Sequence, residues 1–445
     1  MRIDRLALAD SKVPRYTSYP TAAQFTPAVG AIETADWLAA VDPDRPISLY
    51  VHIPFCRQLC WYCGCNTSVT RRTAPIARYL ATLRREVEMV ARLLPGRMQV
   101  SHLHFGGGTP SILGAEDFRG LAALLREHFA FRPEAEVAIE LDPRGLDATR
   151  IAALAGSGVT RVSLGIQDLD PDVQSAINRI QPLDLVSRQV AALRDAGLGR
   201  ISMDLIYGLP RQTTDTIRRT VEAVAGLVPD RVSLFGYAHV PWMKSHQRLL
   251  EPAGLPGAAA RLALCDAATA ALGDAGYESV GIDHFARPDD DLARAARVGR
   301  MRRNFQGYTT DDAACLIGFG ASAIGSFAQG LVQNATRTDD WSAAIDGGRL
   351  STSRGVRVDA TDRRRARIIE RLMCDFAVDL AQDIARDPAI RDILGGIEDL
   401  ARLGIARVDG TRLAVPSDAR PFARIVAARF DRYLAPAATR HAAAV

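Results

Sequence analysis

Four of the seven cysteines lie within ten residues of one another, in the spacing Cys56-x3-Cys60-x2-Cys63-x-Cys65. The first three thiolates could each bind one iron of a 4Fe–4S cluster, which leaves the fourth iron open for a small ligand. Zinc is the main alternative, but structural zinc sites usually pair two Cys-x2-Cys knuckles, and the sequence contains no second knuckle. A third interpretation is four buried cysteines without function. The compact spacing favours the iron–sulfur cluster.

The remaining cysteines are scattered singly, at Cys265, Cys315 and Cys374. Their surroundings are apolar, and we expect them to be small core residues. A secreted disulfide scaffold would distribute its cysteines differently. The pattern is that of a cytosolic metal or redox centre.

Polar or glycine-rich segments follow each of six strand-like runs. The first run leads into the cysteines, and the second ends in the glycine-rich segment 106–110. The other four runs end at polar positions, namely Glu140 and Asp142, Gln167 and Asp168, Asp204, and Tyr237, Ala238 and His239. In parallel α/β folds the carboxyl ends of the strands form the catalytic face. We therefore expect these side chains to converge in one site.

Strand-like and helix-like runs alternate along about two hundred residues. Strands are expected at 47–54, 99–110, 136–143, 161–168, 200–210 and 231–240. Between them, apolar residues recur at every third or fourth position, as in 76–94 and 183–197, which is typical of amphipathic helices. The alternation predicts a parallel sheet with right-handed crossovers. Six units are fewer than the eight of a TIM barrel, so the predicted fold class is α/β, an open, partial (β/α)6 barrel.

Segments of different character flank the predicted barrel. Residues 1–35 form an N-terminal arm, and the barrel domain is expected over 36–345. Residues 346–445 are predicted to be a small, mainly helical, winged-helix-like domain, in which Asp409-Gly410 is a hairpin turn signal. We expect the tail, 434–445, to fray.

The composition is that of an ordinary globular protein, with 48% hydrophobic and 24% charged residues. No apolar run approaches the roughly 18 residues of a membrane span, and the N-terminus lacks the features of a signal peptide. We therefore expect a cytoplasmic protein, and a monomer. The net charge of +4 without a concentrated basic stripe argues against nucleic-acid binding. Lys12 and Lys244 are the only lysines, which argues against Schiff-base chemistry.

Several motifs together resemble one family. The cysteine spacing after the first strand and Gly-Gly-Gly-Thr-Pro after the second are the signature of the radical S-adenosylmethionine superfamily. Cys65 and five longer runs are similar to the oxygen-independent coproporphyrinogen III oxidases: PRYTSYPT (14–21), LYVHIPFC (49–56), DLIYGLP (204–210), HFARPDDDLA (284–293) and RNFQGYTT (303–310). The resemblance extends from about residue 14 into the C-terminal domain. Related haem chaperones typically lack the fourth cysteine and the last two runs.

The resemblance implies an activity. It is the oxygen-independent decarboxylation of two propionate side chains of coproporphyrinogen III to vinyl groups, giving protoporphyrinogen IX in haem biosynthesis. A 5′-deoxyadenosyl radical from S-adenosylmethionine would abstract a hydrogen from the propionate β-carbon, and an acceptor would take one electron as CO₂ leaves. The cofactors, a 4Fe–4S cluster and two S-adenosylmethionine molecules, would carry the radical chemistry. An electron donor such as a flavodoxin or ferredoxin is also implied.

The resemblance further implies ligands. Cys56, Cys60 and Cys63 would bind the cluster, whereas Cys65 would lie beside it without binding. The positions implied for the cluster-bound S-adenosylmethionine are Tyr50, Gly107, Glu140, Gln167, Arg179, Asp204 and Ile324. Those implied for the second molecule are Tyr62, Gly108, Thr109 and Ala238. The residue types agree, because glycines allow close backbone approach, carboxylates suit an ammonium group and an arginine suits a carboxylate.

A structural role is the alternative for several of these residues. The glycines 106–108 could form a strand-to-helix turn, Tyr50 could be a core aromatic, and Arg179 could be a solvated helix residue. A substrate with four propionates needs guanidinium and imidazole donors. The candidates for substrate contact, which could also be ordinary loop residues, are His284, Arg287, Arg15 and Tyr16.

Two other functions stay open at this point. A haem-binding chaperone on the same scaffold would be a carrier without turnover. Another radical enzyme acting on a tetrapyrrole would need a different substrate-binding arm. The runs 14–21 and 303–310 argue against both.

Overall fold

The computed structural model describes residue 6 and residues 8–434. The N-terminal residues 1–5 and 7, which the signal-peptide expectation covers, lie outside the described residues. The same holds for 435–445, so the expected fraying of the tail concerns residues that are not described.

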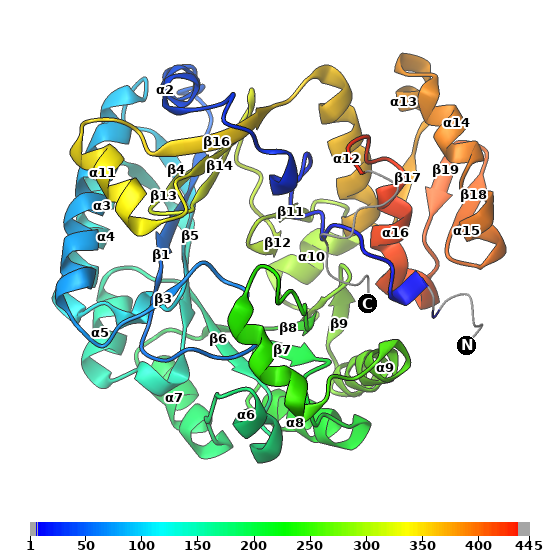
Figure 1. Ribbon diagram of the computed structural model, residues 1–445, viewed down its shortest axis with the longest axis horizontal. Coiled ribbons are helices and arrows are strands. Elements are labelled where there is room, and N and C mark those ends of the chain that lie inside the picture. The colour runs from blue at the N-terminus through cyan, green and yellow to red at the C-terminus, as the bar shows by residue number, and fades with distance from the viewer. Residues whose placement is uncertain (1–5, 7, 435–445) are drawn as a thin grey trace.

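A curved twelve-stranded sheet forms the centre of the molecule (Figure 1). All six predicted strands are present and adjacent in chain order: β1 (Ile47–Ile53), β4 (Gln99–Gly107), β5 (Ala130–Leu141), β6 (Arg161–Gln167), β7 (Arg200–Tyr207) and β8 (Arg231–Gly236). Each pairs in parallel with the next, for example Tyr50 with His104 and Asp204 with Ser233. The predicted parallel, partial barrel is confirmed.

Six further strands extend this sheet and were not predicted. β13 (Cys315–Phe319) pairs in parallel with the free side of β1. The others pair in antiparallel fashion beyond β13 and β8: β14 (Ile324–Phe327), β15 (Gly330–Asn334), β16 (Thr352–Arg357), β10 (His284–Ala286) and β9 (Glu278–Val280). The sheet does not close, because β16 and β9 are its two edges.

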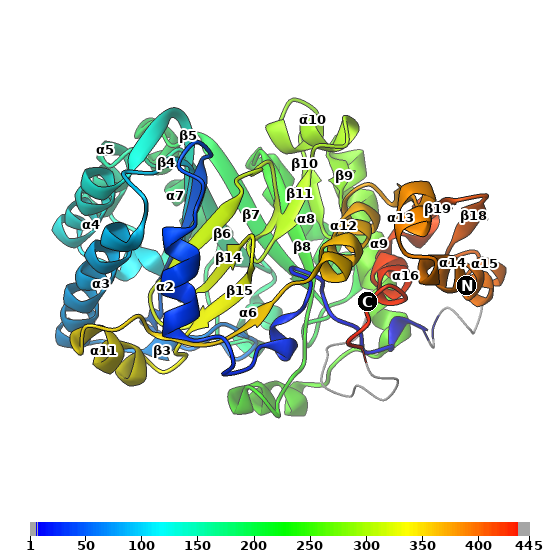
Figure 2. The same cartoon turned by 90° about the horizontal axis from the view of Figure 1, so that it is seen from above.

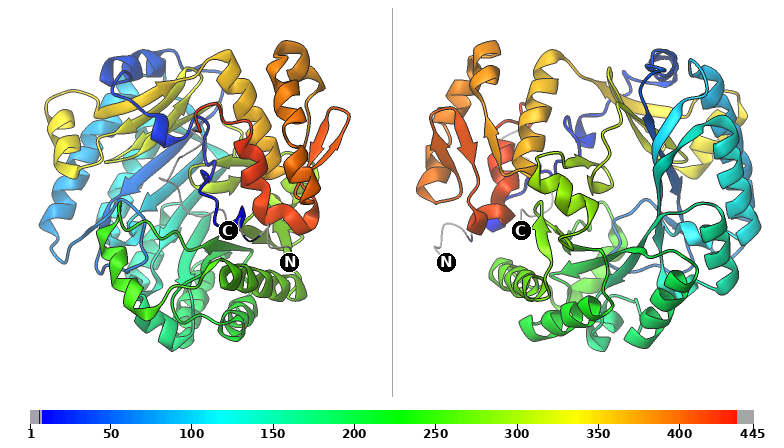
Figure 3. Two further views of the ribbon diagram at one scale, coloured as in Figure 1. Left: turned by 45° about the vertical axis from the view of Figure 1, so that its right-hand side comes forward. Right: turned by 180° about the vertical axis from the view of Figure 1, so that it is seen from behind.

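Helices cover the outer face of the sheet (Figures 1 and 3). They are α3 (Ala74–Leu93), α4 (Ala115–His128), α5 (Ala148–Gly156), α6 (Pro171–Ala176), α7 (Leu183–Asp195), α8 (Thr214–Gly226) and α9 (Ala258–Asp274). α3 buries Ile76, Leu80, Leu83 and Val87, the apolar stripe predicted from its periodicity. None of the helices in the described part of the chain has the length and apolar character needed to cross a membrane.

A smaller unit packs beside the open side of the barrel (Figure 2). It contains α12 (Ala360–Cys374), α13 (Ala381–Arg386), α14 (Ala389–Gly395), α15 (Glu398–Arg402), α16 (Ala423–Ala428) and a sheet of β17 (Ala377–Asp379), β19 (Arg412–Ala414) and β18 (Arg407–Asp409). The predicted hairpin is confirmed, with Gly410 in the left-handed region at its turn (φ +58°). The expected boundary at residue 345 is too early, because β16 still pairs with β15 of the central sheet.

The N-terminal arm ties this smaller unit to the barrel. Val13, Tyr16 and Tyr19 are buried in the core of the C-terminal unit. Thr26 then bridges to Gly355 in β16. The expected end of the arm at residue 35 falls inside α2 (Ala31–Ala39), so the arm passes into the barrel without a linker.

A buried carboxylate joins α3 to the segments that extend the sheet beyond β1. Glu86 accepts hydrogen bonds from the Gly320 amide (2.6 Å), Asn334 Nδ2 (2.8 Å) and Trp341 Nε1 (3.0 Å). Trp341 belongs to α11 (Thr338–Asp346), so one side chain connects four segments. Burial raises the pKa of Glu86 to about 7, although all three hydrogen bonds favour the charged form.

This pKa shift predicts how stability depends on pH. The folded protein holds the Glu86 proton more tightly than the unfolded chain, whose carboxyl has the ordinary pKa of 4.5, so stability falls as the pH rises from about 4.5 to about 7. Glu86→Gln removes this titration. We expect the free energy of unfolding of the wild type, relative to the variant, to drop by up to about 3 kcal/mol between pH 5 and 8. Urea unfolding at both pH values measures it. The same change at exposed Glu127 in α4 should leave the pH dependence as in the wild type.

Candidate active site

The cysteine loop is closed at its base and held from one side. β2 (Phe55–Cys56) and β3 (Ser68–Val69) pair in parallel and join the two ends of the loop. The carbonyl oxygens of Tyr62, Cys63 and Cys65 accept hydrogen bonds from Gln247 (2.9 Å), His246 (2.8 Å) and Lys244 (2.7 Å), respectively. The segment after β8 therefore fixes the backbone of the loop.

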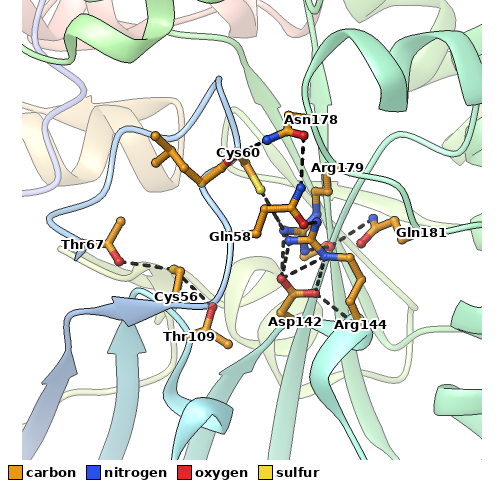
Figure 4. A network of polar contacts seen from close by, with 12 residues as sticks. Cys56, Gln58, Cys60, Thr67, Thr109, Asp142, Arg144, Asn178, Arg179 and Gln181 are labelled. Atoms are coloured by element: carbon orange, nitrogen blue, oxygen red, sulfur yellow. Dashed lines mark hydrogen bonds and ion pairs between the residues drawn. The ribbon is translucent and has the colours of Figure 1, made fainter. Parts of the chain in front are cut away.

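Two of the thiols face hydrogen-bond donors. Cys56 Sγ lies 3.2 Å from Thr67 Oγ1 and 3.4 Å from Thr109 Oγ1. Cys60 Sγ lies 3.4 Å from Arg179 Nη1 and 3.6 Å from Arg144 Nη2 (Figure 4). Hydrogen bonds to sulfur and positive charge stabilise thiolates, so both environments suit a metal-bound sulfur.

Cys63 and Cys65 differ although they are two residues apart. A hydrogen bond from Cys65 lowers the pKa of the Cys63 thiol below its ordinary value, and the same contact raises the pKa of Cys65. Cys65 is also exposed, whereas Cys63 is half-buried and Cys60 is buried.

The thiols do not converge on one point. Within the described residues, no group of three or more His, Cys, Asp or Glu side chains is arranged to hold a single metal ion. A 4Fe–4S cluster needs no such convergence, because each thiolate binds a different iron. Three cysteines on one short loop, two of them with sulfur-directed donors, therefore fit the cluster better than a zinc ion.

A carboxylate holds the two arginines that face Cys60. Asp142, just after β5, accepts from Arg144 Nη2 (2.6 Å) and Nε (3.0 Å). Arg179 Nη1 lies 3.3 Å from the same carboxylate, and Arg179 Nη2 donates to the Gly165 carbonyl at 2.5 Å. Burial opposes the charge on Asp142, but the hydrogen bond from Arg144 and the charge of Arg179 lower its pKa below the ordinary value.

Arg179 keeps one buried donor unused. Its side chain is 7% exposed, and its Nε–H has no hydrogen-bond partner among the described residues. A buried donor without a partner is costly, so the position fits an absent acceptor such as the carboxylate of an amino acid. A Cβ at Gly165 would lie 2.8 Å from Gln167 Nε2 and 3.1 Å from Arg179 Nη2, so this glycine makes room for both side chains. Gln167 itself has a left-handed backbone (φ +67°), a conformation that is frequent at functional sites.

Glu140 and the glycine segment form a second part of the site. Glu140 Oε2 accepts from the Gly107 amide (3.2 Å), and Oε1 lies 3.0 Å from His104 Nε2. The Tyr50 ring stacks on His104, with ring centres 5.9 Å apart. Despite burial, these donors lower the pKa of Glu140, so a charged carboxylate faces the end of β4 and suits an ammonium group.

A cavity of about 210 Å³ inside the barrel connects Glu140 with Asp204. Asp204 accepts a hydrogen bond from Ser163 at 3.1 Å, but burial raises its pKa. His284, Gln306 and Tyr308 line the same cavity.

The residues expected at a second S-adenosylmethionine lie around the first group. Thr109 donates its amide to the Phe55 carbonyl (2.9 Å) and faces Cys56, and a Cβ at Gly108 would lie 2.5 Å from Thr67 Oγ1. Tyr62 packs on the small apolar cluster that includes Val173 and Ile177. Ala238 follows β8, and Ile324 begins β14, so both lie at the carboxyl edge of the parallel strands.

The four expected substrate residues do not all reach the site. His284 lines the cavity, and Arg15 donates to the Gly236 carbonyl at the end of β8 (2.8 Å). Tyr16 does not, because it is buried in the C-terminal unit and its hydroxyl donates to Asp431 (3.1 Å). Arg287 follows β10 beside the amino end of β8, pairs with Asp289, and does not line the cavity.

Sequence reasoning missed several buried arginines: Arg161 and Arg231 line the cavity, and Arg303 precedes Asn304, which also lines it. The Arg303 side chain is 4% exposed, and it stacks 4.4 Å from the centre of the Tyr308 ring. Within the described part of the chain its Nε and Nη1 have no hydrogen-bond partner, and a carboxylate oxygen of Asp283 lies 3.8 Å from Nη1. The run 303–310 contained this residue, but nothing in the pattern indicated that its side chain is buried.

Comparisons with known proteins agree with this geometry. Residues 50–224 match the family model described as the radical SAM superfamily. The chain is 47% identical to the oxygen-independent coproporphyrinogen III oxidase of Bradyrhizobium diazoefficiens, covering 100% of both chains, and 43% identical to that of Paracoccus denitrificans, covering 100% of this chain and 99% of the relative. It superposes on the solved coproporphyrinogen III oxidase from Escherichia coli, titled a radical SAM enzyme, with a TM-score of 0.90 and 37% identity, covering 95% of this chain and all of the other.

The Asp142 network predicts a role for Arg144 in binding S-adenosylmethionine. Arg144→Gln removes the charged hydrogen bonds that position Asp142, and Asp142 in turn positions Arg179. All three cluster cysteines remain. We expect iron and sulfide content as in the wild type but at least roughly tenfold weaker binding of S-adenosylmethionine, since hydrogen bonds to charged groups contribute about 1.5–3 kcal/mol. Equilibrium dialysis of the anaerobic protein measures this. Arg188→Gln, which breaks an exposed pair with Asp184, is the control. Unchanged affinity in Arg144→Gln would contradict the role.

Proposed function

The chain belongs to the family of oxygen-independent coproporphyrinogen III oxidases, and we propose that it decarboxylates two propionates of coproporphyrinogen III to vinyl groups without oxygen, giving protoporphyrinogen IX. The observation that carries the proposal is 47% identity along the whole length of a relative with that name. The cysteine loop and its arginine donors support it, because they fit the 4Fe–4S cluster and S-adenosylmethionine of a radical enzyme. The protein is an oxidoreductase.

The chain's own residues hold and orient the cofactors. Cys56, Cys60 and Cys63 would bind the cluster, and Arg179 and Glu140 would bind the carboxylate and ammonium groups of S-adenosylmethionine. When bound, these cofactors supply a 5′-deoxyadenosyl radical that abstracts a hydrogen from the propionate β-carbon.

The substrate would lie between the cofactors and the arm. Arg303 supports this position, because its buried guanidinium has unused donors beside a single carboxylate, Asp283. The charges of Arg303 and Arg15 both lower the pKa of Asp283 despite its burial. An excess of positive charge at this point suits a propionate of the substrate.

Partners and location complete the proposal. Cluster reduction needs a one-electron donor such as a flavodoxin or ferredoxin. We propose a cytoplasmic monomer that binds no nucleic acid, which agrees with the balanced charge of the sequence.

Anaerobic turnover tests the function. The reconstituted protein is incubated with coproporphyrinogen III, S-adenosylmethionine and dithionite, and vinyl products are separated by chromatography. We expect protoporphyrinogen IX, and no product from Cys56→Ser. Tight haem binding without turnover would instead identify a carrier.

Cys65 should be dispensable for the cluster. The Cys65 thiol donates a hydrogen bond to the Cys63 sulfur, and the hydroxyl of Cys65→Ser can donate in the same way. We expect this variant to retain about four irons and four sulfides per chain but to turn over more slowly, whereas Cys63→Ser loses the cluster. Iron and sulfide assays after anaerobic reconstitution measure both. Loss of the cluster in Cys65→Ser with retention in Cys63→Ser would reverse the assignment.

Arg303 should affect binding of the substrate and not of S-adenosylmethionine. We expect Arg303→Gln to raise the KM for coproporphyrinogen III at least roughly tenfold, from the loss of a charged hydrogen bond, with iron content and S-adenosylmethionine affinity unchanged. Arg302→Gln is the matched control. Arg302 is the preceding residue, and its side chain is 51% exposed and pairs with Glu370. Equal KM values for both variants would exclude Arg303 from substrate contact.

A further inference from the structure

The segment that carries the cysteines contains no acidic residue. Residues 46–85 include six arginines and no Asp or Glu. The whole chain has 51 acidic residues in 445, so forty residues at the average frequency would hold four or five. The near-neutral net charge therefore conceals one locally basic segment.

Four of these arginines form an exposed basic surface. Arg57, Arg71, Arg72 and Arg78, which we call the basic surface, are all exposed. Within the described residues none of them has a carboxylate oxygen within 4 Å, whereas exposed Arg85, Arg188 and Arg218 each have one. Arg57 Nη1 donates to the Thr70 carbonyl (3.3 Å), which keeps the two ends of the surface together.

The basic surface lies directly behind a predicted cluster ligand. Cys56 pairs with Val69 in the β2–β3 ladder, and Arg57 and Thr70 are the next residues of each strand. Val69, an apolar residue two positions before Arg71, is 48% exposed. Cys56 is itself half-buried, so this predicted ligand lies close to the surface.

A groove adjoins this surface. It has a volume of about 790 Å³ and lies between the β2–β3 ladder, the start of α3 and α11; β3 and α11 are seen at one edge of the molecule in Figure 2. Phe55, Thr67 and Arg78 line it on the side of the ladder and α3; on the side of α11 it is lined by Asp339 and by Asp346, which pairs with Arg85. Thr67 Oγ1 is 3.2 Å from Cys56 Sγ, so a protein seated in the groove would be separated from that sulfur by one side chain.

We propose that the basic surface and this groove dock a small acidic one-electron carrier protein that reduces the cluster. The inference rests on the proposed function, which requires an electron from outside the chain. Charge complementarity identifies the occupant: four unpaired guanidiniums and one exposed apolar residue suit an acidic surface with an apolar centre at its redox group. Electron-transfer encounters are typically small and transient, and long-range charge attraction raises their association rates.

The test compares two charge reversals in the full-length, cluster-loaded protein. Arg71→Glu/Arg72→Glu reverses the basic surface. Arg391→Glu/Arg407→Glu makes the same change at exposed positions on α14 and β18 of the C-terminal unit. Stopped-flow absorbance follows cluster reduction by reduced flavodoxin, and separately by photoreduced 5-deazariboflavin, an uncharged small molecule. Calorimetry measures binding of oxidised flavodoxin.

We expect the surface variant to be reduced by flavodoxin at least roughly tenfold more slowly at low ionic strength, with weaker binding and a smaller salt dependence. The control and the deazaflavin rates should match the wild type. Wild-type flavodoxin rates in the surface variant would overturn the proposal, as would an equal slowing with deazaflavin. A raised KM for coproporphyrinogen III with normal reduction would also overturn it and assign the arginines to substrate. Deazaflavin-driven turnover tests the proposed function independently, because it needs no docking.

Discussion

The buried carboxylate of Asp142 is the contact on which the arrangement around Cys60 depends. It binds Arg144 and Arg179, whose side chains are 17% and 7% exposed. Without this carboxylate, the two largely buried cations would repel each other with little screening by water. One carboxylate between two guanidiniums leaves an excess of one positive charge. The nearest group that can balance it is the Cys60 sulfur, at 3.4 and 3.6 Å. As a metal ligand this sulfur would be a thiolate, whose charge would balance that of the two arginines and Asp142.

The same principle applies where the arm meets the barrel. Asp283 is flanked by Arg303 and Arg15, and burial together with the charge of Arg15 lowers the pKa of Arg424 to about 10. Two guanidiniums again lie near one carboxylate, this time beside a cavity. The arm contributes one of these guanidiniums, since burial of Tyr16 in the C-terminal unit brings Arg15 to the end of β8.

The sequence predicted those parts of the fold that depend on local pattern. The six parallel strands are long apolar runs between amphipathic helices, and their carboxyl ends met as expected because a parallel sheet requires it. β13 to β16 were missed, since they are short and glycine-containing and form only by pairing with β1 and with one another. Cys60, Glu140 and Arg179 were singled out by motif and resemblance. Lys244, His246 and Gln247 were not, because they hold the loop through backbone carbonyls, which leave no signature in side-chain patterns. Arg287 and Tyr16 do not line the cavity, because nothing local determines the direction of a side chain in a loop or arm.

The absence of acidic residues from 46–85 follows from how the site divides its charges. The carboxylates that serve the cofactors come from β5 and β7, where Asp142 is held by two arginines, and Glu140 by His104 and the Gly107 amide. Both carboxylates therefore have their hydrogen-bond partners outside the cysteine loop, and the loop supplies no carboxylate of its own. A carboxylate on the loop would repel both the thiolates and any negatively charged protein approaching from outside. The loop can therefore present thiolates to the inside and guanidiniums to the outside, separated by the two-residue ladder of β2 and β3.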